Sequence, residues 1–262
     1  MPRAAGTDGY IHGVLGLPDH ITTCLFDLDG VLTQTAKVHN AAWKDMFDVY
    51  LRGRSVQRGE PFVPFDSGGD YNAYVDGRPR ADGVRTFLAS RGIELPEGSP
   101  DDPPSVETVN GLGNRKNEMV LRRIREQGVE VYPGSVTYLH AAREAGLRRA
   151  VVSASANAAE VLAAAGIEDL LEVRVDGKVA AAERLRGKPH PDTFLYAAQL
   201  MKAEPAQAVV FEDATAGVQA GRDGHFGYVV GVDRVGQADA LRAHGASIVV
   251  LDLADLLNGA TS

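Results

Sequence analysis

Cysteine is almost absent from this chain of 262 residues, which contains only Cys24. A single cysteine excludes an intrachain disulfide and a cysteine-based zinc site, and it is compatible with a reducing compartment. A continuous apolar run of about 18 residues is also absent, so no membrane-spanning helix is expected. The first 20 residues are interrupted by glycine, proline and aspartate, and they lack the apolar stretch of a signal peptide. These absences predict a soluble cytoplasmic protein.

An excess of basic residues is absent as well. Lysine and arginine total 27 against 35 aspartates and glutamates, which gives a formal net charge of −8. Such a chain lacks the electrostatic footprint of a nucleic-acid-binding protein. We therefore expect neither nucleic acid nor membrane as a partner, and we favour a monomer although the sequence leaves the oligomeric state open. An anionic substrate would need a local cationic pocket that overcomes the global field.

Short apolar runs rich in valine and isoleucine recur along the chain, as in strands buried on both faces of a parallel sheet. The expected strands are 21–26, 150–152, 208–211, 228–232 and 248–251. Helix-like segments separate them at 135–145, 156–165, 191–202 and 214–222. With 44% apolar residues the chain can bury a sizeable core. This alternation predicts an α/β fold with a Rossmann-like parallel sheet.

The segment after the first run differs, because no strong strand pattern occurs in it. Helix-like patterns cover 36–51, 84–91 and 114–126, whereas 52–80 is rich in glycine, proline and charge. The stretch 94–104 holds four prolines and is expected to be a loop. We predict an α/β core of residues 18–35 and 134–258, interrupted by an inserted helical domain of residues 36–133.

Carboxylates stand at the ends of two apolar runs. Asp27 and Asp29 follow the first run, and strand alternation points both to the same side of the chain. Glu212 and Asp213 follow the run at 208–211. Like charges so close repel and raise each other's pKa unless a cation intervenes. Ligands of open α/β sheets bind at the carboxyl ends of strands, and carboxylate oxygens suit Mg²⁺. The pattern therefore predicts a magnesium site.

Two further segments offer groups that suit an anion. Ser153 follows the run at 150–152 and precedes a helix, where backbone amides and a hydroxyl form an anion site. Lys188 precedes the helix expected near Pro191 and can neutralise a phosphate as a point charge. Taken singly, each of these segments is commonly a turn, a helix cap or a surface loop. Their order, each at a strand end, favours one shared site.

Four motifs occur in the order found in the haloacid dehalogenase-like phosphotransferases, namely Asp27-x-Asp29, Ser153, Lys188 and Glu212-Asp213. The chain resembles that superfamily from about residue 21 onward, and within it the β-phosphoglucomutases. The resemblance implies that Asp27 is the nucleophile that becomes phosphorylated and that Asp29 is the general acid and base. It also implies that Asp29 binds Mg²⁺ through its main-chain carbonyl, while Asp27 and the second carboxylate pair supply side-chain ligands.

The resemblance implies further substrate- and phosphate-binding residues, namely Thr35, His39, Trp43, Gly77, Arg80, Lys116, Ser153, Ala154, Ser155, Asn157 and Lys188. The inserted domain would be a cap that closes over the substrate. Within it, Arg80 would bind the phosphate far from the nucleophile, and Lys116 would contact substrate. Trp43 would either line the substrate or pack in the core of the cap. The loop at 94–104 looks longer than a minimal cap requires.

The implied activity interconverts β-D-glucose 1-phosphate and glucose 6-phosphate through a 1,6-bisphosphate, with a phosphorylated hexose as the partner. The alternative is a Mg²⁺-dependent sugar-phosphate phosphatase, which would share every core motif. A hydrolytic dehalogenase is disfavoured because it has no use for Asp29 or the metal pair. A phospho-accepting regulatory domain without turnover would show a similar acidic cluster. The inserted domain with Arg80 and Lys116 argues against that last class.

Overall fold

The computed structural model describes residues 15–257, which fall into two compact units. Unit 1 comprises residues up to Thr33 and from Glu130 onward, and unit 2 comprises Gln34–Val129. The chain therefore passes between the units twice, after Thr33 and before Glu130. Each unit has its own hydrophobic core.

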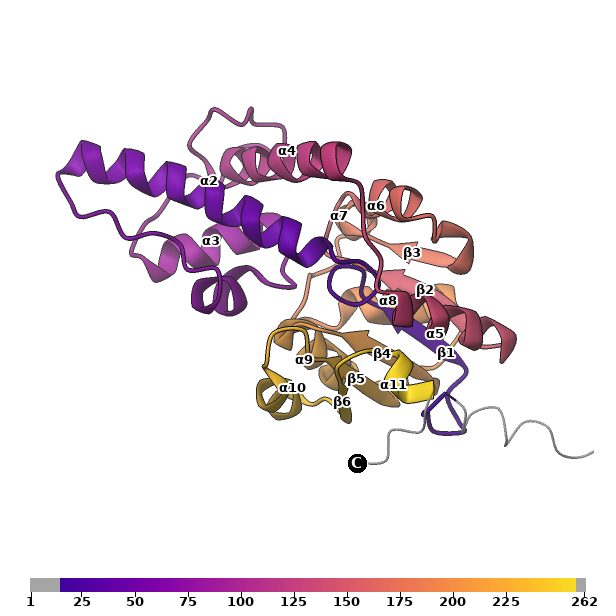
Figure 1. The fold of residues 1–262 in the computed structure, drawn as a ribbon. Coiled ribbons are helices and arrows are strands. Elements are labelled where there is room, and N and C mark those ends of the chain that lie inside the picture. The colour runs from indigo at the N-terminus through magenta and orange to yellow at the C-terminus, as the bar shows by residue number, and fades with distance from the viewer. Residues whose placement is uncertain (1–14, 258–262) are drawn as a thin grey trace, which may run out of the picture. The chain divides into compact units, whose positions relative to one another are not determined.

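Unit 1 is built on a parallel sheet (Figure 1). Its described strands are β1 (Thr23–Phe26), β2 (Arg148–Val152), β3 (Val173–Val175), β4 (Ala208–Glu212), β5 (Tyr228–Val232) and β6 (Ile248–Val250). They lie in the order β3-β2-β1-β4-β5-β6, and every neighbouring pair is parallel. The central strand β1 is buried throughout because it has a neighbour on each side and helices on each face. The predicted α/β fold with a Rossmann-like parallel sheet is confirmed.

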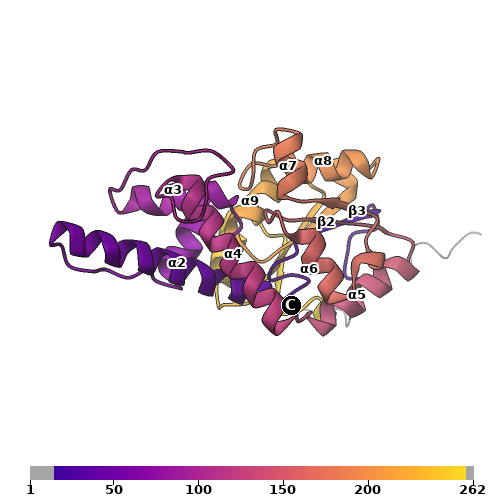
Figure 2. The same ribbon diagram turned by 90° about the horizontal axis from the view of Figure 1, so that it is seen from above.

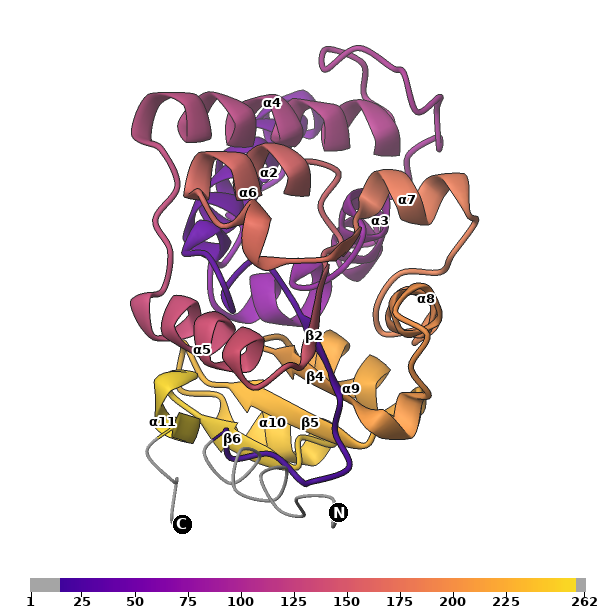
Figure 3. The same cartoon turned by 90° about the vertical axis from the view of Figure 1, so that its right-hand side faces the viewer.

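Helices cover both faces of this sheet. Those described in unit 1 are α5 (Pro133–Glu144), α6 (Ala158–Ala165), α7 (Gly177–Ala182), α8 (Asp192–Leu200), α9 (Thr215–Asp223), α10 (Ala238–His244) and α11 (Ala254–Leu257), with 3-10 turns η2 (Glu168–Leu170) and η3 (Pro205–Gln207). Figure 3 shows α5 and α11 on one side of the sheet and α8 and α9 on the other. On the α5 side, the Tyr138 ring meets Phe26 and Phe211 edge-on, and these two rings stack at 4.5 Å. The aromatic contact fixes β1 against β4.

Unit 2 is helical within the part of the chain that the structure describes. It contains α2 (Thr35–Arg58), the π-helical turn η1 (Tyr71–Val75), α3 (Arg80–Ser90) and α4 (Val109–Gln127). Figure 2 shows α2, α3 and α4 side by side, with α4 packed against both others. At the start of α4, the Thr108 hydroxyl accepts a hydrogen bond from the Gly111 N–H and so caps the helix. At the end of α2, the helix is terminated by Gly59, whose φ of +66° suits glycine.

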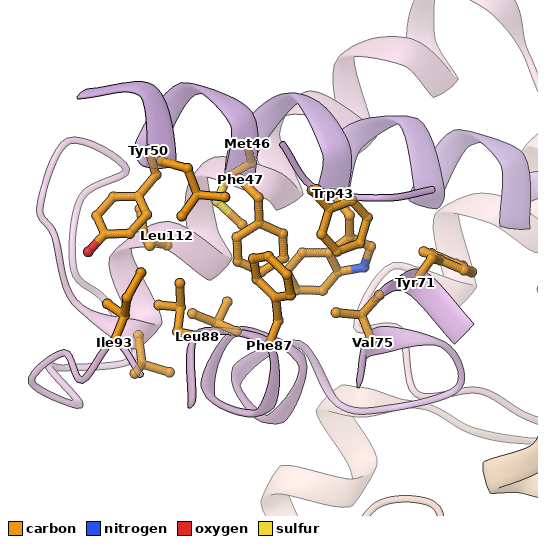
Figure 4. Packing of buried hydrophobic residues seen from close by; sticks show 14 residues of the cluster. Trp43, Met46, Phe47, Tyr50, Tyr71, Val75, Phe87, Leu88, Ile93 and Leu112 are labelled. Atoms are coloured by element: carbon orange, nitrogen blue, oxygen red, sulfur yellow. The ribbon is translucent and has the colours of Figure 1, made fainter. Parts of the chain in front are cut away.

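The core of unit 2 is aromatic (Figure 4). From α2, the ring of Phe47 stacks on Trp43 at 5.2 Å and lies 4.2 Å from the ring of Phe87 on α3. Val49 on α2 is 58% exposed and does not contribute to this core. The buried face instead runs through Ala42, Trp43, Met46, Phe47, Tyr50 and Leu51. Aromatic side chains at adjacent turns therefore set the inward face of α2.

Several helices are longer than their sequence patterns predicted. The α2 helix was expected to end at Leu51 but continues to Arg58, because arginine and glutamine are good helix formers. The expected helices 84–91 and 114–126 begin at Arg80 and Val109. Strand β3 was missed, since it has only three residues and its middle residue is exposed. The helices α7 and α10 were missed as well, because they are short.

None of the helices between residues 15 and 257 combines the length and the apolar character that a bilayer span requires. The longest of them, α2, exposes the charged side chains of Lys37, Asp45, Arg52 and Arg58. This finding agrees with the absence of a long apolar run in the sequence.

Candidate active site

The turn after β1 brings the first two aspartates to the carboxyl edge of the sheet. Asp27 directly follows β1, its backbone N–H donates to Phe211 O on β4 at 2.9 Å, and its side chain is buried. The turn closes where the Gly30 N–H donates to Thr33 O at 2.8 Å. Gly30 has a φ of +90°, and a Cβ added there would lie 1.7 Å from Asp213 Oδ2. Glycine is therefore required here both for the backbone and for the close approach of Asp213.

The second carboxylate pair lies at the neighbouring strand end. Glu212 is the last residue of β4 and is 1% exposed, and Asp213 is also buried. The Glu212 carboxylate accepts the Ala214 N–H at 3.1 Å, at the start of α9. A Cβ at Gly217 would lie 1.9 Å from Glu212 Oε1, so the lack of a side chain on α9 makes room for this carboxylate. This role of Gly217 was not predicted from the sequence.

Lys188 lies between the two carboxylate groups. Its ammonium ion-pairs with Asp27, lies 2.5 Å from Glu212 Oε1, and donates to Val152 O at 3.2 Å. Burial disfavours the charged lysine, but the carboxylates of Asp27 and Glu212 outweigh it and raise the Lys188 pKa above its usual value. Burial, together with the neighbouring carboxylates, also raises the pKa of Asp27 despite the attraction of Lys188. Lys188, which was predicted to neutralise a phosphate, therefore contacts Asp27, the predicted nucleophile.

The carboxylates of Asp27, Glu212 and Asp213 form a cluster that fits a metal ion. One oxygen from each lies within 4.8 Å of the other two, and all three residues are buried. Buried carboxylates concentrated in this way repel one another unless a cation is shared among them. An all-oxygen donor set of this kind suits a hard divalent cation. The geometry therefore describes a candidate metal site made of three of the four predicted acidic residues.

The loop after β2 carries the predicted phosphate-binding serine. The Ser153 hydroxyl donates to Asp29 Oδ2 at 3.4 Å and accepts the Ser155 N–H at 3.0 Å. The Ser155 hydroxyl in turn accepts the Asn157 N–H at 3.2 Å. A Cβ at Gly177 would lie 2.9 Å from the Ala154 carbonyl oxygen. The loop is thus turned by its own hydroxyls and backed by the start of α7.

In unit 2, Lys116 joins two of the predicted residues. Its ammonium lies 2.9 Å from His39 Nδ1 and 4.8 Å from the centre of the Trp43 ring. His39 and Trp43 are four residues apart and so present one face of α2 to α4. Trp43 is 3% exposed and belongs to the hydrophobic core of unit 2, the second of the two alternatives left open by the sequence. Thr35 is buried at the first residue of α2.

Arg80 lies at the start of α3, directly after the turn that contains Gly77. Gly77 has a φ of +67°, which suits glycine. The Arg80 guanidinium donates to Asn114 Oδ1 at 2.9 Å, and a Cβ at Gly113 would lie 3.1 Å from Arg80 Cγ. Asn114 was missed by the sequence reasoning, although it lies only two residues before the predicted Lys116.

Two further residues behind the acidic turns were missed because they lie in a loop without a motif. After β5, Arg234 Nε donates to the Gly30 carbonyl oxygen at 2.9 Å, and Gln237 Nε2 donates to the Asp213 carbonyl oxygen at 2.8 Å. The Arg234 guanidinium also lies 3.5 Å from the centre of the Tyr132 ring. These contacts tie the loop after β5 to both turns that carry aspartates.

Comparison with known proteins places this geometry in context. A β-phosphoglucomutase of Mycobacterium tuberculosis is 56% identical over 247 residues, which cover 93% of this chain and 94% of that protein. A β-phosphoglucomutase of Bacillus subtilis is 29% identical over 232 residues, 88% of this chain and 90% of that protein. The crystal structure of a β-phosphoglucomutase from Clostridium difficile aligns with a TM-score of 0.70 at 26% identity, covering 90% of this chain and 93% of the other.

The match to a family covers both units. The sequence model of the haloacid dehalogenase-like hydrolase family matches residues 21–225, which include all four motifs and the whole of unit 2. This extent, and the identity to relatives over nearly their full length, agree with the resemblance seen in the sequence. The chain belongs to the haloacid dehalogenase-like hydrolase family.

Proposed function

We propose that the protein is a β-phosphoglucomutase, which interconverts β-D-glucose 1-phosphate and glucose 6-phosphate through a 1,6-bisphosphate. The observation that carries this proposal is the 56% identity to a β-phosphoglucomutase across nearly the whole of both chains. The contacts of Lys188 with Asp27 and Glu212 support the chemistry, since phosphoryl transfer depends mainly on positioning and on neutralising charge. The phosphatase alternative is less favoured because a β-phosphoglucomutase is 56% identical over 247 residues, whereas a fructose-1-phosphate phosphatase is 31% identical over 200 residues.

In this proposal, Mg²⁺ is the metal held by the carboxylates of Asp27, Glu212 and Asp213, with the main-chain carbonyl of Asp29 as a further ligand. One oxygen of each carboxylate lies within 4.8 Å of the other two, and all three residues are buried, which supports this assignment. When bound, Mg²⁺ would neutralise charge that develops on the transferring phosphoryl group.

The proposed chemistry belongs to Asp27 and Asp29. A carboxylate oxygen of Asp27 attacks phosphorus, and the bond between phosphorus and the sugar oxygen breaks. Asp29 donates a proton to that leaving oxygen, and it later removes a proton from the sugar hydroxyl that attacks the aspartyl phosphate. The Ser153 hydroxyl, 3.4 Å from Asp29 Oδ2, and the Lys188 ammonium would hold the phosphoryl oxygens during both transfers. Ser155 and the backbone at Ala154 and Asn157 would complete that grip.

Unit 2 would act as the cap that distinguishes a mutase from a phosphatase. An aspartyl phosphate hydrolyses unless water is excluded, and an inserted domain that closes over the substrate supplies that exclusion. Arg80 would hold the phosphate remote from Asp27, while the Lys116–His39 pair would contact the sugar. A mutase needs this second grip because its bisphosphate carries a phosphate at each end.

A coupled assay tests the proposal. Wild-type protein with Mg²⁺ and a trace of glucose 1,6-bisphosphate is offered a panel of hexose 1-phosphates, while glucose 6-phosphate formation and phosphate release are followed in parallel. We expect isomerisation of β-D-glucose 1-phosphate to exceed phosphate release. Release of inorganic phosphate alone, even after priming with the bisphosphate, would show a phosphatase instead. The cytoplasmic location and the monomeric state stay predictions, which fractionation and size-exclusion chromatography would check.

A further inference from the structure

The long proline-rich loop between α3 and α4 is attached to α4 at several points. Near the start of the loop, Pro96 O accepts a hydrogen bond at 2.9 Å from the N–H of Val109, the first residue of α4. Near its end, Arg115 Nε donates to Pro104 O at 2.6 Å. The loop therefore lies along the first turns of α4 and is held by specific hydrogen bonds, although its sequence suggested only an exposed connection.

Asn114 connects this loop to Arg80. Its Oδ1 accepts a hydrogen bond from Arg80 Nη2 at 2.9 Å, while its Nδ2 donates to Pro100 O and to Asp102 O, each at 2.9 Å. One side-chain amide thus uses its acceptor on the guanidinium and both of its donors on the loop. The two donations also fix which way the amide faces, because a flipped amide would turn its oxygen toward two carbonyl oxygens.

The arrangement suits an arginine that must later bind an anion. Arg80 lies against Gly113, where a Cβ would come within 3.1 Å of Arg80 Cγ, so the side-chain stem is guided as well as the guanidinium. Asn114 is uncharged, and it orients Arg80 without neutralising it. An arginine that is already ordered loses less side-chain freedom when a phosphate arrives.

We propose that Asn114 is a positioning residue that holds Arg80 for the phosphate remote from Asp27, with the loop 91–108 fixing Asn114 in turn. This inference rests on the proposed mutase function. It assigns a purpose to the extended loop, which is to brace the second phosphate grip. Asn114 acts through Arg80 and is not expected to touch the substrate itself.

The test is Asn114→Ala in the full-length protein, assayed with β-D-glucose 1-phosphate, Mg²⁺ and glucose 1,6-bisphosphate. We expect KM to rise by up to about tenfold, because Arg80 must then be ordered when the phosphate binds. We expect kcat to stay within about twofold, because the groups around Asp27 are untouched. Asn110→Ala is the matched control, because Asn110 Nδ2 binds the loop at Glu97 O at 3.0 Å and does not contact Arg80 or the Pro100 and Asp102 carbonyls that hold Asn114.

A double-mutant cycle separates positioning from mere structural support. If Asn114 acts through Arg80, adding Asn114→Ala to Arg80→Ala changes kcat/KM by less than about twofold. The inference is overturned if that addition costs as much as in the wild-type background, or if Asn110→Ala raises KM equally. A wild-type protein that releases phosphate without isomerisation overturns the proposed function, and the inference with it. Thermal unfolding of each variant checks that the fold is kept.

Discussion

The same substitution at two helical glycines is expected to have opposite effects on stability. Gly53 lies inside α2, and a Cβ added there meets nothing within 4 Å. Gly217 lies in α9, and a Cβ there would lie 1.9 Å from Glu212 Oε1 and 2.0 Å from Glu212 Cδ. Neither glycine has a positive φ. Gly53→Ala should therefore raise the free energy of unfolding by about 1 kcal/mol, the difference in helix propensity.

Gly217→Ala must push the Glu212 carboxylate out of its place. That carboxylate is buried, lies 2.5 Å from the Lys188 ammonium and accepts the Ala214 N–H at 3.1 Å. Separating a buried ion pair costs about 3–5 kcal/mol. After subtraction of the helix-propensity gain of about 1 kcal/mol, Gly217→Ala should lose about 2–4 kcal/mol of stability.

Urea unfolding of wild type and both variants, with and without Mg²⁺, measures these changes. At a concentration about 100 times its Kd, Mg²⁺ should stabilise the wild type by about 2.7 kcal/mol, and Gly53→Ala by the same amount. Gly217→Ala should gain less, because a ligand of the proposed site has been displaced. The reasoning is refuted if Gly217→Ala is as stable as Gly53→Ala and shows the full magnesium-dependent gain.

Three other predictions address the core, the pH dependence and the chemistry. Phe47→Ala removes a fully buried ring from the core of unit 2 and should lower the free energy of unfolding by about 3–5 kcal/mol, measured by urea titration. Burial alone would raise the pKa of Asp233, but hydrogen bonds from the backbone N–H groups of 235–238 outweigh it and lower that pKa. A lowered carboxylate pKa gives stability that is present above the unfolded pKa of about 3.9 and is lost as the pH falls through the folded value. Asp233→Asn should therefore weaken the pH dependence of the free energy of unfolding between about pH 5 and pH 3, measured by urea titration at each pH. Asp27→Asn should reduce mutase turnover by about a thousandfold or more while circular dichroism shows the fold unchanged.

The sheet was predictable where strands are buried on both faces, and less so elsewhere. Strand β5 was predicted with its observed bounds, because valine fills three of its five positions and suits a strand buried on both faces. Strand β3 lies at the edge and buries only one of its three residues fully, so it left no apolar run to detect. In unit 2, the charged, glycine-containing stretch after Leu51 suggested a loop, although α2 continues to Arg58 because arginine and glutamine are good helix formers.

The core of the site was predictable because its residues come from strand ends, where a parallel sheet brings distant segments together. The positions of Asp27, Ser153 and Glu212 follow from that rule, whereas Lys188 lies in the loop between α7 and α8 and was predicted from the order of the motifs. Supporting residues were not predictable in the same way. Gly217, Asn114 and Gln237 contribute through a missing side chain or through contacts to backbone carbonyls. Such contributions depend on three-dimensional approach, and a single sequence carries no spacing that reports it.

The insertion of unit 2 directly after β1 has a consequence for the order of synthesis. Thr23 in β1 pairs with Arg148 in β2 and Ala208 in β4, so the whole of unit 2 is made before the first partner of β1 exists. Unit 2 is one continuous stretch and needs no later segment to complete its aromatic core. During translation it is therefore expected to fold first. The strand that leads into the reactive aspartate must wait, unpaired and apolar, until the ribosome has delivered the rest of its sheet.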